Sequence, residues 1–354
     1  MINRRDFGRL LTASGIAAVG SLAGPSPASP AVRPARRAAK PLLKPRRLAP
    51  GDTVGMILPA TMAFEASTIE IGREQLEALG FRVKLGAHVR ARHGYFAGTD
   101  RERAADLQAM FEDDAVQGIF CYSGGWGSPR LLPLLDFDRI RRHPKVFIGF
   151  SDVTALLNAV HQETGLVTFH GPVASSILRP WTLAHLRRAL QSAEPLGALT
   201  NPPKEEDELV NRAFRTLTIR GGRARGRLVG GNLTLLAALM GTPWEVDTAG
   251  AILLLEDTDE ELYRIDRMLT QLALGGKLEG VAGVVFGTCT DCPVEGPSFS
   301  LEEILRERLE PLGVPVLKGL AFGHIPEKLT LPIGLPATLD ADAGTLTLDE
   351  AAVV

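Results

Sequence analysis

Apolar and polar positions in the first half of the chain alternate in short blocks that predict strands and helices in turn. Strands are predicted where apolar residues run together or alternate with polar ones, at Thr53–Leu58, Phe81–Leu85, Val116–Cys121 and Val146–Ile148. Helices are predicted between them, at Glu65–Leu79 and from a capping box at Thr99-Asp100-Arg101-Glu102 through to Phe111. This alternation is typical of an α/β domain with a mostly parallel sheet, where ligands bind beyond the carboxyl ends of the strands.

The second half of the chain repeats the alternation. The predicted elements are a small-residue helix over Gly230–Met240, strands at Ala251–Leu255, Val281–Phe286 and Val316–Leu320, and helices at Tyr263–Leu274 and Leu301–Leu312. Because 354 residues are long for one domain, we expect an N-terminal domain over 51–175 and a C-terminal α/β domain over 227–354. The stretch 176–226, which has prolines and a polar run, is predicted to connect them.

Residues 1–50 have the pattern of an export signal and a disordered leader. Basic residues precede a mildly apolar run that is too short to span a membrane. The pair Arg4-Arg5 before Asp6-Phe7 resembles a twin-arginine signal, and a general secretory signal with a chance arginine pair is the alternative. We therefore expect an exported, periplasmic protein. Gly24–Pro50, rich in proline, alanine and arginine, is predicted to be disordered.

The composition is that of an ordinary soluble protein, with 45% hydrophobic and 23% charged residues. The formal net charge of −2 hides an asymmetry, because residues 1–47 carry +9 and the remainder carries −11. An acidic body argues against nucleic acid as a partner.

The stretch Lys145–His161 contains the first candidate for chemistry. A strand, a sharp turn at Gly149-Phe150-Ser151-Asp152 and a helix place Ser151 at a helix N-terminus, which is the geometry of a nucleophile elbow. The usual second glycine of such an elbow is missing. On this stretch alone, an N-cap is the commoner role for such a serine.

The glycine-rich loop Tyr122–Ser128 lies beyond the neighbouring predicted strand. We expect an oxyanion hole there, made by the backbone N–H groups of Gly125 and Asp152. The alternatives are a phosphate cradle, for which the usual glycine spacing is missing, and a plain turn.

The remaining polar candidates leave alternatives open. By residue pattern alone, a general base is equally His170 or His324, and Glu256 and Asp257 either serve at the end of a strand or lie in a solvated loop. No metal-ligand spacing of the H-E-x-x-H type occurs, so we expect no metal and no cofactor. Cys289 and Cys292 fit a redox pair, half a metal site or, as the favoured interpretation, buried thiols or an incidental pair. Oxidation to a disulfide after export is left open, because exported proteins meet disulfide-forming conditions.

Several motifs together resemble the LD-carboxypeptidase family of serine peptidases, which includes muramoyl-tetrapeptide carboxypeptidases and microcin C immunity peptidases. They are the run from Ser123 to Ile140, the stretch Val146–Pro172, Gly230-Gly231-Asn232-Leu233-Thr234, Leu255-Glu256-Asp257, Tyr263–Arg267, Gly323-His324-Ile325-Pro326 and Leu331–Gly334. The resemblance covers about Pro50 to Leu348. It implies two α/β domains with the active site in the cleft between them, and a homodimer.

The resemblance assigns a catalytic triad to this chain, with Ser151 as nucleophile, His324 as base and Glu256 as its partner. It implies removal of the terminal D-amino acid, typically D-Ala, from murein tetrapeptides, so an arginine or backbone donors should bind the substrate carboxylate. The chain departs from the family at Ser123, where an arginine is usual, and at Trp126, where a tyrosine is usual. It also carries an export signal, whereas relatives that recycle cell wall are generally cytoplasmic.

Three other functions remain open at this stage. They are cleavage of an aminoacyl-nucleotide antibiotic, as in the immunity peptidases, non-catalytic binding of murein peptides, and an α/β-hydrolase esterase, whose elbow would be G-x-S-x-G.

Overall fold

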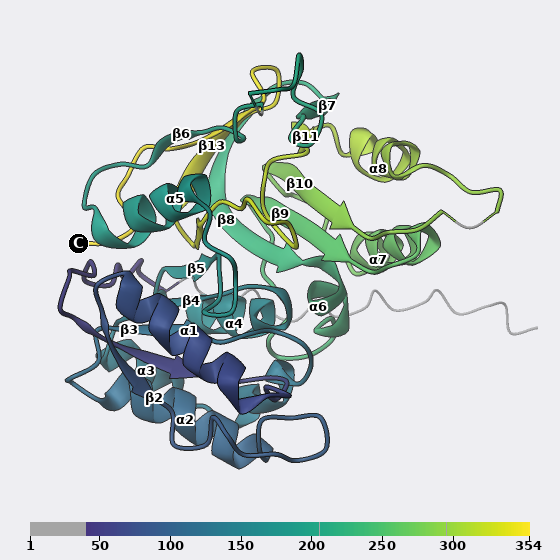
Figure 1. The fold of residues 1–354 in the computed structure, drawn as a ribbon. Coiled ribbons are helices and arrows are strands. Elements are labelled where there is room, and N and C mark those ends of the chain that lie inside the picture. The colour runs from purple at the N-terminus through teal and green to yellow at the C-terminus, as the bar shows by residue number, and fades with distance from the viewer. Residues whose placement is uncertain (1–39, 205, 295) are drawn as a thin grey trace, which may run out of the picture. The chain divides into compact units, whose positions relative to one another are not determined.

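The computed structural model describes residues 40–204, 206–294 and 296–354. The predicted export signal, which lies within residues 1–39, is outside the described residues. The described chain forms two sheets with helices packed on them (Figure 1).

The first sheet has the strand order β12-β5-β4-β3-β1-β2. Its strands are β1 (Thr53–Ile57), β2 (Arg82–Leu85), β3 (Gly118–Cys121), β4 (Val146–Gly149), β5 (Thr168–His170) and β12 (Leu331–Ile333). Strands β1 to β5 pair in parallel, whereas β12 comes from the C-terminal part of the chain and pairs antiparallel with β5. The carboxyl ends of β3, β4 and β5 therefore lie at one edge of this sheet.

Helices cover both faces of the first sheet. They are α1 (Ala66–Ala78), α2 (Asp100–Glu112), α3 (Phe137–Arg142) and α4 (Thr154–Thr164), with the 3-10 turns η1 (Ser128–Leu134) and η2 (Ser151–Val153). Because neighbouring strand residues face opposite sides, Met56 of β1 packs in one core with α1, and Ile57 packs in another with α2, α3 and α4. The predicted capping box at Thr99 is confirmed. No helix in the described ranges is long and apolar enough to cross a membrane.

The second sheet has the strand order β6-β14-β13-β8-β9-β10-β11-β7. The strands are β6 (Gly197–Leu199), β7 (Leu217–Arg220), β8 (Arg223–Asn232), β9 (Ala251–Thr258), β10 (Gly283–Thr290), β11 (Val316–Lys318), β13 (Pro336–Asp340) and β14 (Thr345–Leu348). Strands β8 to β11 are parallel and the flanking pairs are antiparallel. One face packs against α6 (Leu233–Ala238), α7 (Leu262–Leu274) and α8 (Leu301–Leu309), which the turn η3 (Glu310–Leu312) follows.

The opposite face of the second sheet shares a core with the first sheet. Leu254 of β9, Phe169 of β5 and Ile69 of α1 belong to one continuous buried cluster, together with Leu186 of α5 (Pro180–Gln191). The predicted α/β fold with a mostly parallel N-terminal sheet and a second α/β part is confirmed. The stretch 176–226 contributes α5 and two strands of the second sheet, β6 and β7.

The stretch Lys40–Pro50, which the sequence placed in a disordered leader, is packed instead. Leu48 is only 1% exposed, the Leu43 N–H donates to the Gly165 carbonyl, and the Arg47 N–H donates to the Val354 carbonyl. Prolines remove helical or strand periodicity from a sequence, but they do not prevent an extended segment from burying apolar side chains.

Two predicted boundaries in the C-terminal half were also wrong. Gly230 and Gly231 complete β8 instead of opening a helix, and α6 begins at Leu233 with the Asn232 side chain as its cap. Strand β9 continues beyond its predicted end at Leu255 to Thr258. Both strands have hydrogen-bonded neighbours on each side, so the sheet holds polar and glycine residues in the strand conformation against their local preference.

The structure corrects the favoured interpretation of Cys289 and Cys292, which form a disulfide at the end of β10. The chain turns back there, so two cysteines three positions apart face each other with a Cα–Cα distance of 5.8 Å. Cys121 is the free, buried thiol that an odd number of cysteines requires.

Candidate active site

Ser151 follows β4 directly and has a strained backbone. Its φ is +62°, a left-handed conformation that side-chain-bearing residues rarely adopt outside functional turns. The N-cap residues of η2 and α4 are Phe150 and Val153, not Ser151, and neither start has a side-chain cap hydrogen bond. The structure therefore favours the strained elbow over the capping role.

The glycine-rich loop after β3 lies against this serine. A Cβ placed on Gly124 would come within 2.9 Å of Ser151 Oγ and 3.2 Å of the Asp152 nitrogen, so only glycine fits at this position. Sequence reasoning singled out Gly125 and missed this role of Gly124. Gly125 adjoins Thr61, whose Oγ1 accepts a hydrogen bond from the Trp126 N–H at 2.9 Å.

Asp152 fastens the loop to the serine turn. Its Oδ2 accepts the Ser128 N–H at 2.7 Å, and its carbonyl accepts the Ser128 hydroxyl at 2.5 Å. Burial raises the pKa of this carboxyl group, although the bonds from Ser128 oppose that effect. Buried hydrogen bonds thus hold the glycine-rich loop, which carries Gly125, against the serine turn, which carries Asp152. The backbone N–H groups of these two residues are the candidate oxyanion donors.

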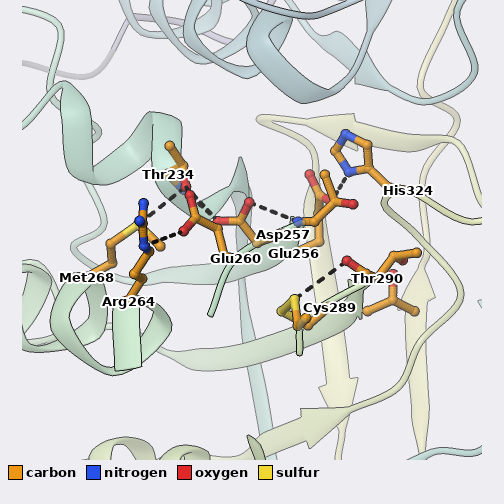
Figure 2. The surroundings of a disulfide bond; sticks show 12 residues. Thr234, Glu256, Asp257, Glu260, Arg264, Met268, Cys289, Thr290 and His324 are labelled. Carbon is orange, nitrogen blue, oxygen red and sulfur yellow. Dashed lines mark hydrogen bonds and ion pairs between the residues drawn. A yellow bond between two sulfur atoms is a disulfide. The ribbon is translucent and has the colours of Figure 1, made fainter. Parts of the chain in front are cut away.

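Glu256 lies within β9 and is fully buried, so the solvated-loop alternative is wrong. Its Oε2 lies 2.8 Å from Nδ1 of His324, and its Oε1 lies 3.7 Å from Nε2 of His170. Figure 2 shows Glu256 and His324 pointing toward each other. Burial alone would raise the pKa of Glu256, but the two histidines outweigh it and hold this pKa well below its usual range. Glu256 is therefore a carboxylate that can orient His324.

His324 lies on a short loop that is closed by a hydrogen bond from the Leu329 N–H to the Ala321 carbonyl at 2.8 Å. Gly323 has a φ of +107°, and a Cβ there would lie 2.7 Å from Glu256 Oε2. Glycine therefore allows the loop to approach Glu256 closely. The His324 ring packs edge-on against Phe150, the residue before Ser151, with 4.9 Å between ring centroids.

His170, the other histidine considered as a base, is 1% exposed at the end of β5. Within the described chain neither of its ring nitrogens makes a hydrogen bond. Its Nε2 lies 3.7 Å from Glu256 Oε1, which is too far for a hydrogen bond, so the interaction between the two side chains is electrostatic. It is buried beside the carboxylate, and the family resemblance assigns the base to His324 instead.

Asp257, the next residue on β9, faces the opposite side of the sheet because strand side chains alternate. Its carboxylate accepts hydrogen bonds from Asn232 Nδ2 at 3.0 Å and from the Thr234 N–H and hydroxyl at 2.9 Å. Thr234 and Asp257 are both labelled in Figure 2. Burial raises the pKa of Asp257 to about 6. On one side of β9, Asp257 pairs with Cys289 of the disulfide, and on the other side Glu256 pairs with Asn232 of β8. The end of β9 that carries Glu256 is therefore held by both neighbouring strands.

Besides Gly124, sequence reasoning missed two residues whose side chains lie at the site. Phe150 contacts the rings of His170 and His324, and Lys328 lies over the Phe150 ring with its Nζ 3.9 Å from the centroid. Their positions in the sequence could have indicated them, because Phe150 directly precedes the elbow serine and Lys328 follows His324 by four residues. Neither residue type indicates a site by itself.

The architecture and this chemistry together have the features of a serine hydrolase: a strained serine after a parallel strand, and a buried carboxylate that holds a histidine. The chain belongs to the LD-carboxypeptidase family. Residues 54–171 match the model of the LD-carboxypeptidase N-terminal domain, and residues 225–339 match that of the C-terminal domain. The resemblance predicted from the sequence is confirmed.

Individual relatives match over most of their length. The chain is 42% identical to a probable murein peptide carboxypeptidase of Bacillus subtilis over 86% of this chain and 94% of the relative. It is 36% identical to the murein tetrapeptide carboxypeptidase of Pseudomonas aeruginosa over 82% of this chain and 93% of the relative. A solved structure of the microcin C7 self-immunity protein MccF is 29% identical and matches with a TM-score of 0.79, over 88% of this chain and all of the other.

Proposed function

We propose that this protein is a serine LD-carboxypeptidase that hydrolyses the L–D peptide bond of murein tetrapeptides and releases the terminal D-amino acid, typically D-Ala. The observation that carries the proposal is the hydrogen-bonded pair of the buried Glu256 and the half-buried His324 beside the turn of Ser151. The murein assignment is supported by the relatives named for murein peptides, which are 36% and 42% identical. The immunity protein MccF of Escherichia coli is less similar to this chain, at 30% identity, so the immunity-peptidase alternative has less support.

In the proposed mechanism, His324 takes the proton of Ser151 as Oγ attacks the scissile carbonyl. Glu256 holds Nδ1 of His324 in the donor tautomer and stabilises the imidazolium that forms. The tetrahedral oxyanion is bound by the backbone N–H groups of Asp152 and Gly125, and the loss of one such donor typically costs about 10²–10³ in rate. His324 then protonates the leaving amine, and water hydrolyses the acyl-enzyme.

The purified chain should release D-Ala from a murein tetrapeptide, and mass spectrometry of the products measures this directly. An all-L tetrapeptide should remain intact. Aspartyl sulfamoyl adenosine, which is bound to MccF in a solved structure, is the comparison substrate for the immunity-peptidase alternative. Preferential cleavage of that compound would contradict the murein assignment, and binding of the tetrapeptide without turnover would favour a non-catalytic binder.

We further propose that the protein is exported through the twin-arginine route and works in the periplasm as a homodimer. The pair Arg4-Arg5 before a weakly apolar run supports the route, and the family resemblance supports the dimer. Replacement of both arginines with lysine should leave the protein in the cytoplasmic fraction of fractionated cells. Unchanged appearance in the periplasm would contradict the twin-arginine route.

A further inference from the structure

Lys328 is a buried cation that the proposed mechanism does not use. It lies on the same closed loop as His324, and its backbone N–H donates to the Thr182 hydroxyl of α5 at 3.0 Å. Thr182 in turn donates to Glu327 at 2.8 Å. One loop, fastened to α5, therefore presents both the candidate base and a lysine.

The ammonium group of Lys328 has an aromatic ring and one carboxylate nearby, but it makes no hydrogen bond to another described residue. The residue is 7% exposed and its Nζ lies over the ring of Phe150. Throughout the part of the chain that the structure describes, no oxygen accepts a hydrogen bond from this Nζ, and the charge of Glu256 acts on it from β9. Burial lowers the pKa of Lys328 to about 8. A contact with an aromatic ring compensates a buried cation only in part, so the N–H donors of this ammonium group remain available to an anionic ligand.

Two arginines near the glycine-rich loop are already used within the fold. Arg103 donates to the carbonyl groups of Pro59 and Gly127 at 2.6 and 3.0 Å and forms an ion pair with Asp100. Arg130 pairs with the same aspartate at 2.9 Å. These arginines hold the glycine-rich loop and α2, whereas Lys328 faces Phe150 beside the elbow.

We propose that the ammonium group of Lys328 binds the free terminal carboxylate of the substrate, and thereby makes the enzyme act on the last residue of a peptide. This inference rests on the proposed function. An ammonium group that gains a carboxylate partner in a desolvated site forms a strong charge-assisted hydrogen bond. A free carboxylate is present only on the terminal residue, so this contact selects the terminal peptide bond and excludes peptides that continue beyond it.

The test compares a murein tetrapeptide acid with its C-terminal amide in the wild type and in Lys328→Met. The wild type should prefer the acid, and Lys328→Met should lower this preference in kcat/KM by about 10- to 100-fold, mainly through KM. Lys328→Arg keeps the charge and should retain much of the preference. Lys145→Met is the matched control, because Lys145 is equally buried at 7% exposure but donates to the Met110 carbonyl at 3.0 Å, away from the serine. It should lower stability and leave the preference unchanged.

A pH series on the wild type tests the same contact without a variant. The lysine loses its proton as the pH rises through about 8, so the preference for the acid should fall over that range. Glu256, His170 and His324 also face this region, but both substrates experience them, and the ratio cancels their effect on the chemistry.

An acid preference that survives in Lys328→Met would overturn this role of the lysine, as would an equal loss of kcat on both substrates or a preference unchanged up to pH 10. These failures differ from failure of the proposed function, in which the wild type would release nothing from either peptide.

Discussion

Replacing Ser151 with alanine should abolish measurable release of D-Ala, with a loss in kcat of about 10⁴-fold or more. The hydroxyl is the only side-chain group in the proposed mechanism that forms a covalent bond to the substrate. Binding of the tetrapeptide should persist, because the lost interaction acts in the transition state. Release of D-Ala by Ser151→Ala at the wild-type rate would overturn the mechanism, and inhibition of the wild type by a chelator would do the same.

Ser151→Gly is the matched control for folding in this experiment. Both variants lack the hydroxyl, but the φ of +62° strains alanine and suits glycine. We therefore expect the glycine variant to be more stable than the alanine variant by about 1 kcal/mol in urea unfolding, while both remain inactive. Equal stabilities would argue that the turn is not strained in solution.

Replacing Glu256 with glutamine should have the second-largest effect, a loss in kcat of about 10³- to 10⁴-fold with a small change in KM. Glutamine has nearly the shape of glutamate but no charge. The imidazolium that forms on His324 in the transition state would lose its counter-ion at 2.8 Å. Steady-state kinetics on the tetrapeptide, with direct measurement of substrate binding, separates this effect from a loss of affinity.

Asp257→Asn is the matched control for that experiment. It removes the same charge from the next residue of β9, but on the side of the sheet that faces Thr234 and Asn232. Its amide would meet hydrogen-bond donors where the carboxylate accepts them, so the variant should unfold at a lower temperature. Its kcat should stay within about tenfold of the wild type, because its role is structural. A larger loss in Asp257→Asn than in Glu256→Gln would contradict the assignment of Glu256.

Local sequence patterns determined most of the secondary structure and one half of the site. The apolar block before Ser151 and the helical spacing after it predicted the turn between β4 and α4, and the capping box at Thr99 set the start of α2. Such signals depend on neighbouring residues, so they can be read from one chain. Motif resemblance supplied His324 and Glu256, which no local pattern separated from His170 and Asp257.

The tertiary structure decided which of those side chains meet, and the physical reason is the pairing of strands that are distant in sequence. Extension of β9 between two partner strands carried Glu256 from a predicted strand end into a buried position. Strand alternation then turned Glu256 toward His324 and Asp257 toward α6. The closed loop that brings Lys328 over Phe150 depends on long-range hydrogen bonds to α5, and its role could not be read from the residues around it.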